Sequence, residues 1–435
     1  MSARAKTFRA FSAMQSASAA PALSGDTFPT YPPEEVTAAR GSEPGRRGGQ
    51  AGGIANLRVL VSDEHYKHSL GIVRQLGRLG AHVEVLAASR NSLACRSRYC
   101  RGVVHAGART VEAMVAAILN VVRNGRFDLV IPVSSAMTRA LAKRRAEILP
   151  FAQMELADSA AIEMASDKFA VTQLAERLGV PVPRTTPASH ALRYADELRF
   201  PVVVKPRTEA PGRAPVRYAQ SPGELRDILL ASRTSNSLTA AADFLIQEFI
   251  PGFGCGFFAT YQRGTCRRAF MHRRVREYPA SGGVSSCAES FHDPKLERYG
   301  RQILDALKWH GVAMVEFRRD SRDGDYKLIE VNPKFWGSLD LALAAGADFP
   351  GDLCRMALGQ ELAFTDDYRR RLRFHWPLSG HGELFHIWTR PASLFAVAGD
   401  LLNPFVKSNV AFDDPLPNLL ELRGVASQLR RFARG

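Results

Sequence analysis

The chain has 435 residues, with 58 Lys and Arg against 43 Asp and Glu, and a formal net charge of +15 at pH 7. Hydrophobic residues make up 46% and charged residues 23%, which excludes a wholly disordered chain. No stretch reaches about 18 consecutive apolar residues, so no membrane-spanning helix is expected. The six cysteines lack the spacing of a zinc site or a disulfide framework, which favours reduced thiols and a cytoplasmic location. The basic charge leaves nucleic acid, an anionic membrane surface and anionic small molecules open as partners.

The N-terminal segment, residues 1–55, is rich in Ala, Ser, Gly, Pro and Arg. Such a composition buries too little apolar surface to offset its ordering entropy, which predicts a disordered tail. The tail holds six basic and four acidic residues, so it does not account for the net charge.

Residues 56–150 alternate between short apolar runs and amphipathic stretches, which predicts an α/β domain with a parallel sheet. This domain is expected to be Rossmann-like, but no Gly-x-Gly-x-x-Gly follows its first strand, so dinucleotide binding has no support. The expected strands are 57–61, 82–86, 103–104 and 129–131, and the expected helices are 69–79 and 111–122.

Residues 151–360 read as an α+β domain with antiparallel sheets, followed by a less periodic C-terminal extension over 361–435. A helix over 169–178 is expected to be capped by Ser166 or Asp167 and ended by Gly179. The expected strands are 200–206 and 245–250, with strand pairs at 257–261 and 266–272 and at 312–318 and 326–331.

Two strands of the last pair each carry one carboxylate among apolar neighbours, at Glu316 and Glu330. Asn332 lies two residues after Glu330, on the same face of the strand. Carboxylates in apolar strands are costly unless they are compensated, and hard oxygen ligands of this kind suit Mg²⁺. A pair of sheet carboxylates held by Lys or Arg explains the pattern equally well, and both readings stay open.

Lys168 and Lys205 each stand where a secondary-structure element begins or ends. Two cations facing a carboxylate pair suit a nucleoside triphosphate, which needs positive charge for its phosphates and a metal for its bridging oxygens. Taken singly, each lysine is explained by a surface position.

Five motifs follow one another along the chain: Asp167-Lys168, Val203-Val204-Lys205-Pro206, Gln247-Glu248-Phe249-Ile250-Pro251-Gly252, Glu316 and Glu330-Val331-Asn332. In this order they closely resemble the motifs of the ATP-grasp superfamily, and within it those of the carbamoyl-phosphate-synthase-like and biotin-carboxylase-like carboxylate–amine ligases. The resemblance covers residues 57–350 and implies a Rossmann-like pre-ATP-grasp domain followed by a two-lobed ATP-grasp fold, with a lid subdomain at about 180–250.

The resemblance also implies roles for individual residues. Arg276, in a segment similar to a substrate-side loop, is expected to stabilise an acyl phosphate, with an ion pair to Glu277 or Glu289 as the alternative. Glu330 and Asn332 join Arg276 as expected catalytic residues. Lys168 and Lys205 would hold ATP phosphates, Gln247, Glu248, Phe249 and Ile250 would form the adenine hinge, and Glu316, Glu330 and Asn332 would ligate Mg²⁺ or Mn²⁺.

The expected function is therefore an ATP- and Mg²⁺-dependent ligase that activates a carboxylate as an acyl phosphate for capture by an amine. The alternative is a catalytically weak ATP-binding module with a regulatory or scaffolding role. The loop after Lys205 departs from the family pattern because it holds one glycine, Gly212, and Lys334 stands where many members have arginine. Small-molecule carboxylates and amines are the expected partners, and a homo-oligomer stays open.

Nucleic-acid binding is not expected, because the sequence has no zinc finger, no basic heptad helix and no basic–aromatic motif. Residues 200–280 hold twelve basic and six acidic residues. This excess of positive charge falls on the stretch that is expected to face ATP and an anionic substrate. Cys287, in the same region, is expected to be an inert thiol.

Overall fold

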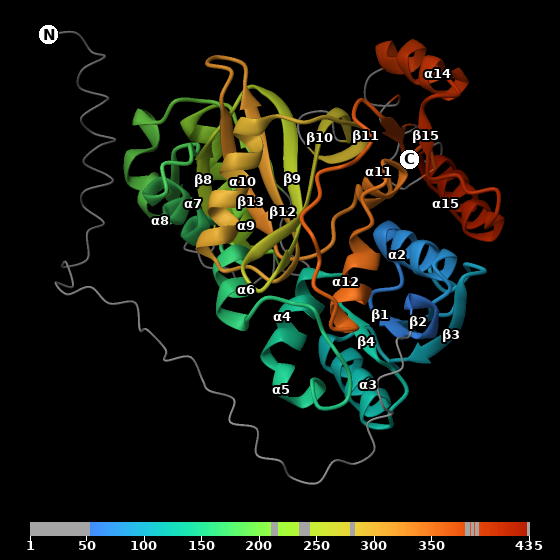
Figure 1. The fold of residues 1–435 in the computed structure, drawn as a ribbon. Coiled ribbons are helices and arrows are strands. Elements are labelled where there is room, and N and C mark those ends of the chain that lie inside the picture. The colour runs from blue at the N-terminus through green and yellow to red at the C-terminus, as the bar shows by residue number, and fades with distance from the viewer. Residues whose placement is uncertain are drawn as a thin grey trace, which may run out of the picture.

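The computed structural model describes residues 53–209, 216–234, 244–278, 283–378, 383, 387 and 391–432. The predicted tail lies outside these residues except for 53–55, where the turn η1 (Ile54–Asn56) begins. The described residues form three sheets, with a parallel sheet below an antiparallel sheet and a mixed sheet in Figure 1.

The first sheet has four parallel strands in the order β3-β2-β1-β4. Strands β1, β2 and β4 are largely buried, as is usual where helices cover a parallel sheet, whereas β3 at the edge is largely half-buried or exposed. The strands and helices predicted over residues 56–150 are confirmed. The elements are β1 (Arg58–Val61), α2 (Lys67–Arg78), β2 (His82–Ala87), β3 (Cys100–His105), α3 (Val111–Arg123), β4 (Leu129–Ile131), α4 (Ser135–Lys143) and α5 (Arg145–Ile148).

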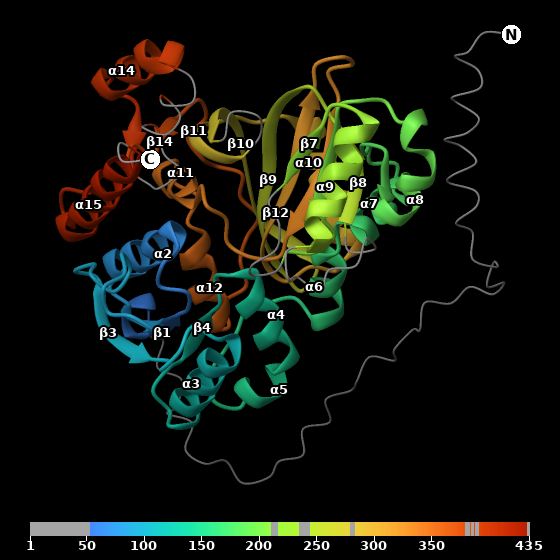
Figure 2. The same cartoon turned by 180° about the vertical axis from the view of Figure 1, so that it is seen from behind.

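The second sheet has four antiparallel strands in the order β5-β8-β6-β7. Figure 2 shows α9 lying over this sheet, and apolar side chains of α9 and the strands form a small core of their own. The elements are α6 (Ser159–Ser166), α7 (Lys168–Arg177), β5 (Thr185–Pro187), α8 (Ala188–Ala191), η2 (Leu192–Glu197), β6 (Val202–Pro206), β7 (Arg217–Ala219), α9 (Pro222–Thr234) and β8 (Phe244–Glu248).

The third and central sheet has seven strands in the order β13-β12-β9-β10-β11-β14-β15. Both predicted strand pairs are present in it, as β9 with β10 and β12 with β13. The extension after residue 361 supplies β14 and β15, so part of it belongs to the central sheet. The elements are β9 (Gly252–Gln262), β10 (Thr265–Tyr278), β11 (Val284–Ser290), α10 (Pro294–Ala306), β12 (Gly311–Asp320), β13 (Tyr326–Asn332), α11 (Leu339–Ala344), α12 (Phe349–Ala357), β14 (Arg373–His375), η4 (Pro391–Ser393), α14 (Leu394–Leu402), β15 (Lys407–Ser408) and α15 (Pro415–Phe432).

The ends of α7 follow the predicted local rules. Asp167 caps the helix, since its side chain accepts hydrogen bonds from the backbone nitrogens of Phe169 and Ala170 at 3.0 and 3.2 Å. Gly179 follows the helix with φ +70°, a conformation that glycine adopts without strain. Asp167, and not Ser166, is therefore the cap, and it fixes Lys168 as the first residue of α7.

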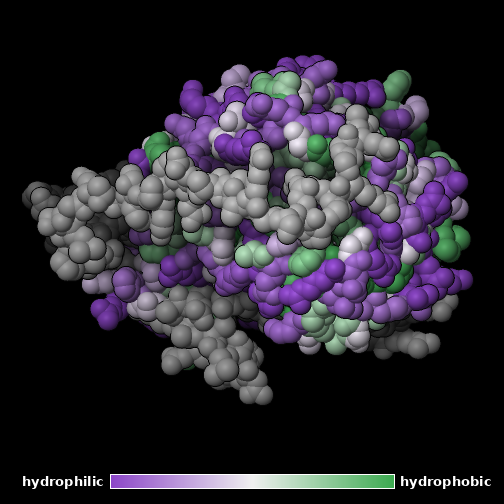
Figure 3. Space-filling view, turned by 60° about the horizontal axis from the view of Figure 1, so that its bottom comes forward, coloured by the Kyte–Doolittle hydropathy of each residue, from purple (hydrophilic) through white to green (hydrophobic). Residues whose placement is uncertain are grey.

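The parallel sheet and the central sheet share one apolar core. Val59 of β1 belongs to the same buried cluster as Phe258 and Phe270 of the central sheet and as Trp336 and Trp376. Cavities between the two sheets therefore have walls held by a common core. On the face turned forward in Figure 3, polar side chains cover most of the described surface and apolar ones form small separate groups. Among the described residues, no helix combines the length and apolarity needed to cross a bilayer.

Candidate functional site

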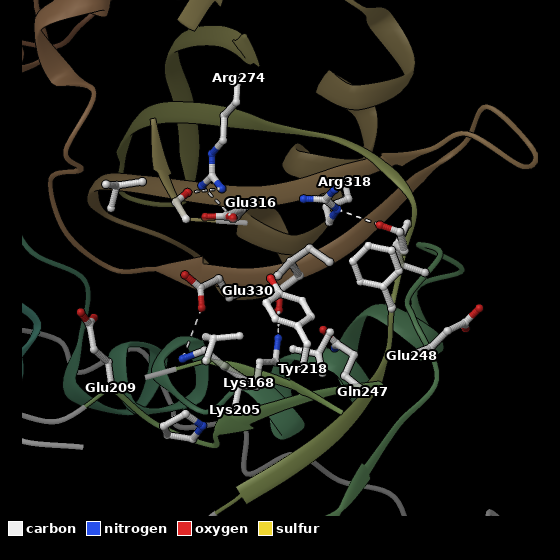
Figure 4. Close-up of a pocket in the computed structure, with 18 of the residues that line it drawn as sticks. Lys168, Lys205, Glu209, Tyr218, Gln247, Glu248, Arg274, Glu316, Arg318 and Glu330 are labelled. Atoms are coloured by element: carbon white, nitrogen blue, oxygen red, sulfur yellow. Dashed lines mark hydrogen bonds and ion pairs between the residues drawn. The ribbon is translucent and has the colours of Figure 1, made fainter. Parts of the chain in front are cut away.

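A cavity of about 440 Å³ lies between the second sheet and strands β12 and β13 of the central sheet (Figure 4). Volumes of this size are typical of small-molecule sites. Side chains from both sheets and from the start of α7 converge on it. Eight predicted site residues line this cavity: Lys168, Lys205, Gln247, Glu248, Phe249, Ile250, Glu316 and Glu330.

The two predicted carboxylates are direct neighbours, because Glu316 and Glu330 are paired in the register of β12 and β13. Glu316 Oε1 lies 2.7 Å from Nη2 of Arg274, and burial raises the pKa of Glu316 above its usual value. Glu330 accepts a hydrogen bond from Nδ2 of Asn332 at 2.9 Å and lies 3.3 Å from Nζ of Lys168. Burial alone would raise the pKa of Glu330, but the two neighbouring lysines outweigh it and lower the pKa to about 2.

The two predicted lysines approach Glu330 from different elements. Lys168 is the first residue of α7, and Lys205 stands near the end of β6 with only 4% of its surface exposed. Nζ of Lys205 donates to the carbonyl oxygen of Ile329 at 3.2 Å, and burial lowers its pKa to about 8. Figure 4 shows both ammonium groups pointing toward the strand that carries Glu330. The structure thus brings together the two cations and the carboxylate pair.

The predicted hinge is held in place by its own side chains. Nε2 of Gln247 donates to Oγ1 of Thr185 at 2.8 Å, and Oε1 of Glu248 lies 2.9 Å from a guanidinium nitrogen of Arg322. Nε of Arg318 donates to the carbonyl oxygen of Ile250 at 2.9 Å. The Gln247 and Glu248 side chains are therefore committed to protein contacts.

The residues expected to hold a metal suit a hard divalent cation. Glu316 and Glu330 supply half-buried carboxylate oxygens at opposed positions, and Asn332 adds an amide beside them. Mg²⁺ prefers such oxygen ligands and bridges phosphates. In their present contacts, Arg274 and Lys168 compensate the two carboxylates, which are the ion pairs that the alternative reading expected.

Arg276 does not reach this cavity, which corrects its expected role at the substrate. Its guanidinium lies 2.7 Å from Oε2 of Glu383 and 2.6 Å from Oδ2 of Asp400, on the side of the C-terminal extension. The expected partners Glu277 and Glu289 are not the ones that it contacts. The pairing of β10 with β11 shifts register on both sides of Arg276, so Arg276 and Arg274 do not share the face that an unbroken strand would give them.

Sequence reasoning missed Arg274 and Arg318, which both line the cavity. Arg274 pairs with Glu316 and with Glu277, and Arg318 secures the hinge. The signal for Arg274 was present, since β10 carries several arginines, but strand periodicity alone does not locate a bulge.

Cys287 is buried, and burial raises the pKa of its thiol to about 12, which agrees with the inert thiol expected. The loop that contains Gly212 lies outside the described residues.

A second cavity, of about 520 Å³, adjoins the first and shares Arg274, Val284 and Glu316 with it. It lies between the start of α2 and strands β12 and β13, and α15 adds Glu421 to its wall. Asn332 and Lys334 line this second cavity. Nζ of Lys334, which lines the second cavity, lies 2.7 Å from Oε2 of Glu209, which lines the first, so an ion pair links the walls of the two cavities.

The chain is similar in sequence to known ATP-grasp proteins. A family described as ATP-grasp in the biosynthetic pathway with Ter operon matches residues 241–376. The arginine-specific large chain of carbamoyl phosphate synthase from Lactiplantibacillus plantarum is 24% identical over 249 residues, which cover 53% of this chain and 24% of that protein. The chain therefore spans about a quarter of the length of this curated relative.

Solved structures of similar fold are ATP-grasp enzymes. The biotin carboxylase domain of 2-oxoglutarate carboxylase from Hydrogenobacter thermophilus, in complex with MgADP, ADP and bicarbonate, has a TM-score of 0.60 at 16% identity, over 73% of this chain and 74% of that one. The L-amino acid ligase from Bacillus licheniformis has a TM-score of 0.54 at 17% identity, over 71% and 75% of the two chains. Together the matches confirm the resemblance to the ATP-grasp superfamily and the mixed α/β fold with parallel and antiparallel sheets. The Rossmann-like label and the domain boundaries stay predictions.

Proposed function

We propose that this chain, which has the ATP-grasp fold, is an ATP- and Mg²⁺-dependent ligase that joins a carboxylate to an amine. The observation that carries the proposal is the convergence of Lys168 and Lys205 on the opposed pair Glu316 and Glu330, in a cavity between two sheets. Two lysines beside two carboxylates balance one another without ligand. Triphosphate with a divalent cation would preserve that balance, since phosphates would take the lysines and the ion would take the carboxylates.

In the proposed reaction, a carboxylate oxygen of the acid attacks the γ-phosphorus of ATP and the bond to the β–γ bridging oxygen breaks. ADP leaves, and the acid becomes an acyl phosphate. The nitrogen of the amine then attacks the carbonyl carbon, loses a proton to solvent and expels inorganic phosphate. Such phosphoryl transfer asks the protein mainly for positioning and for charge neutralisation.

The chain's own residues divide this work between the two cavities. Lys168 and Lys205 would bind phosphate oxygens, and the backbone of residues 247–250 would hold the base. Arg274, which lines both cavities, is placed to orient the reacting carboxylate and takes the role that Arg276 was expected to have. Glu316, Glu330 and Asn332 would hold Mg²⁺, which supplies neutralisation of phosphate charge when it is bound.

The test is acid- and amine-dependent release of ADP by wild type and by Glu330→Gln, with a panel of carboxylic acids and amines. Glu330→Gln keeps the shape of the side chain and the contact with Asn332, and we expect it to lower turnover by about 10²-fold. Glu361→Gln is the matched control, because the Glu361 side chain is 80% exposed and lies in neither cavity. Equal ADP release by wild type and Glu330→Gln would overturn the assignment. Nucleotide binding without turnover across the panel would favour the regulatory or scaffolding module instead.

A small-molecule carboxylate and a small-molecule amine are the partners that this proposal implies, and the cytoplasmic location is a further prediction. The use of Mn²⁺ in place of Mg²⁺ is another, since both ions accept oxygen ligands.

A further inference from the structure

The start of α2 contributes Lys67 and His68 to the wall of the second cavity, to which strands β12 and β13 contribute Glu316 and Asn332. Helix α2 begins at Lys67, and no side-chain oxygen caps it. Its first turn holds no acidic residue. A helix N-terminus carries partial positive charge, so a lysine there without an acid or a capping side chain is locally unfavourable. A positive side chain at an uncapped helix N-terminus beside a cavity points to an anionic ligand, which would neutralise the excess positive charge.

Lys67 has no carboxylate oxygen within 4.0 Å in the described part of the chain; its Nζ lies 4.3 Å from the ring centroid of Trp376. The nearest acids, Asp340 and Glu421, are held by other groups. Asp340 accepts from Nε1 of Trp376 at 3.0 Å, and Glu421 accepts from Nδ2 of Asn409 at 3.0 Å. Burial lowers the pKa of Lys67 to about 8, as expected of an ammonium group that has lost water without gaining a close counter-ion.

Two further polar groups on the wall of this cavity have no hydrogen-bond partner within the described part of the chain. His68 is 8% exposed and its Nδ1 has no hydrogen-bond partner. Trp336 is 3% exposed and its Nε1, which can only donate, has none either. A buried donor without an acceptor costs about 1–3 kcal/mol, which a ligand with acceptor oxygens would recover.

We infer that the second cavity binds an acid with two anionic groups, one reacting at the Glu316 and Asn332 end and the other held by Lys67, His68 and the N-terminus of α2. Tyr66, Phe335 and Trp336 form an apolar and aromatic wall in the same cavity, which suits the carbon skeleton that joins the two groups. The second anionic group is a carboxylate or a phosphate, since both accept several N–H donors. The inference rests on the proposed function for the reacting carboxylate, whereas the Lys67 end stands on its own contacts.

Calorimetric titration of the full chain without nucleotide tests the Lys67 end directly. The probes are glutarate, 4-phosphonobutyrate and pentanoate, which have similar length but two, two and one anionic groups. We expect at least one dianion to bind about tenfold more tightly than pentanoate, the difference typical of one charge-assisted contact. Tighter glutarate identifies a second carboxylate, and tighter 4-phosphonobutyrate identifies a phosphate. Equal binding of all three, or no binding, overturns the inference.

Substitutions at Lys67 locate the effect. Lys67→Met should reduce the preference for the dianion to within about twofold and leave the Kd for ATP unchanged. Lys67→Arg should keep the preference, and Lys143→Met is the control, since the Lys143 side chain is 61% exposed on α4. If Lys67→Met does not fold, acetylation of the wild-type protein at pH 8 tests the same point. The dianion should slow the acetylation of Lys67, and pentanoate should not. A preference that survives Lys67→Met, or labelling of Lys67 that the dianion leaves unchanged, contradicts the inference.

The two proposals fail separately. If the wild-type protein binds the dianion but releases no ADP with any acid and amine of the panel, the ligase assignment is wrong and the anion site is retained. If it releases ADP but binds dianions no more tightly than pentanoate, the ligase assignment is retained and the anion site is wrong.

Discussion

The two adjoining cavities differ in how their charges are balanced. In the first, Lys168 lies 3.3 Å from Glu330 and Arg274 lies 2.7 Å from Glu316, so each carboxylate has its own cation. In the second, Lys67 has no close carboxylate among the described residues, and the buried nitrogens His68 Nδ1 and Trp336 Nε1 lack hydrogen-bond partners there. The first cavity is therefore suited to a ligand that brings both signs of charge, and the second to an anion alone.

The largest expected effect concerns Arg276, which belongs to neither cavity. Arg276→Met removes a buried cation that lies 2.7 Å from Glu383 and 2.6 Å from Asp400. Although Arg373 stays 3.0 Å from Asp400, the loss of this buried ion pair should lower the free energy of unfolding by about 3–5 kcal/mol. Urea denaturation measures this loss, and calorimetry on the folded fraction should find ATP and glutarate affinities unchanged. A stable Arg276→Met protein with a weakened ligand affinity would return Arg276 to the substrate site.

The next effect is a pH dependence of stability that comes from Glu421 in the second cavity. Burial raises the pKa of Glu421 from its usual 4.5 to about 7, despite Arg74 and Lys67 nearby. A raised carboxyl pKa favours folding at low pH, and that stability is lost as pH rises from about 4.5 to about 7. Glu421→Gln keeps the contact with Asn409 and should remove a loss on the order of 3 kcal/mol over this range.

Denaturation curves of wild type and Glu421→Gln at pH 4.5, 6 and 7.5 check this prediction. The difference between the two proteins should grow with pH in favour of the variant. Parallel stability curves would mean that Glu421 ionises freely in the cavity.

Removal of the divalent cation should weaken ATP binding in the first cavity much more than glutarate binding in the second. Without a divalent cation, the phosphates of ATP compete with Glu316 and Glu330 for the same cations, so ATP affinity should fall by about 10²-fold. Glutarate binding in the second cavity should change by less than about twofold. Calorimetry with and without EDTA measures both, and equal sensitivity of the two ligands would break the comparison.

The smallest expected effect is that of Lys205→Met, which removes one of the two lysines expected to bind phosphate in the first cavity. ATP affinity in the presence of Mg²⁺ should fall about tenfold to thirtyfold, because Lys168 remains. Dianion affinity in the second cavity should not change. An equal loss at both sites would show that the variant perturbs the shared wall and not one cation.

Much of the fold was predictable because the relevant signals are local. The apolar run that became β1 and the glycine that ends α7 act over a few residues, as does the Asp167 cap. The membership of β14 and β15 in the central sheet was not predictable, since two- and three-residue strands carry almost no periodicity and depend on their neighbours for pairing.

The sequence by itself determined the ordered motif set and eight residues of the first cavity. Strand periodicity and hairpin pairing place Glu316 opposite Glu330, and a strand end carries Lys205 to the same edge. Only the tertiary structure decided that Arg274 and not Arg276 faces the cavities, since the register shift beside Arg276 depends on its pairing with β11. The second cavity was likewise decided by packing. Lys67 and Glu421 stand near opposite ends of the described chain, with Trp336 between them in sequence. The core shared by the two sheets brings α2 and Trp336 together, and Arg74 of α2 holds α15 through Asn418.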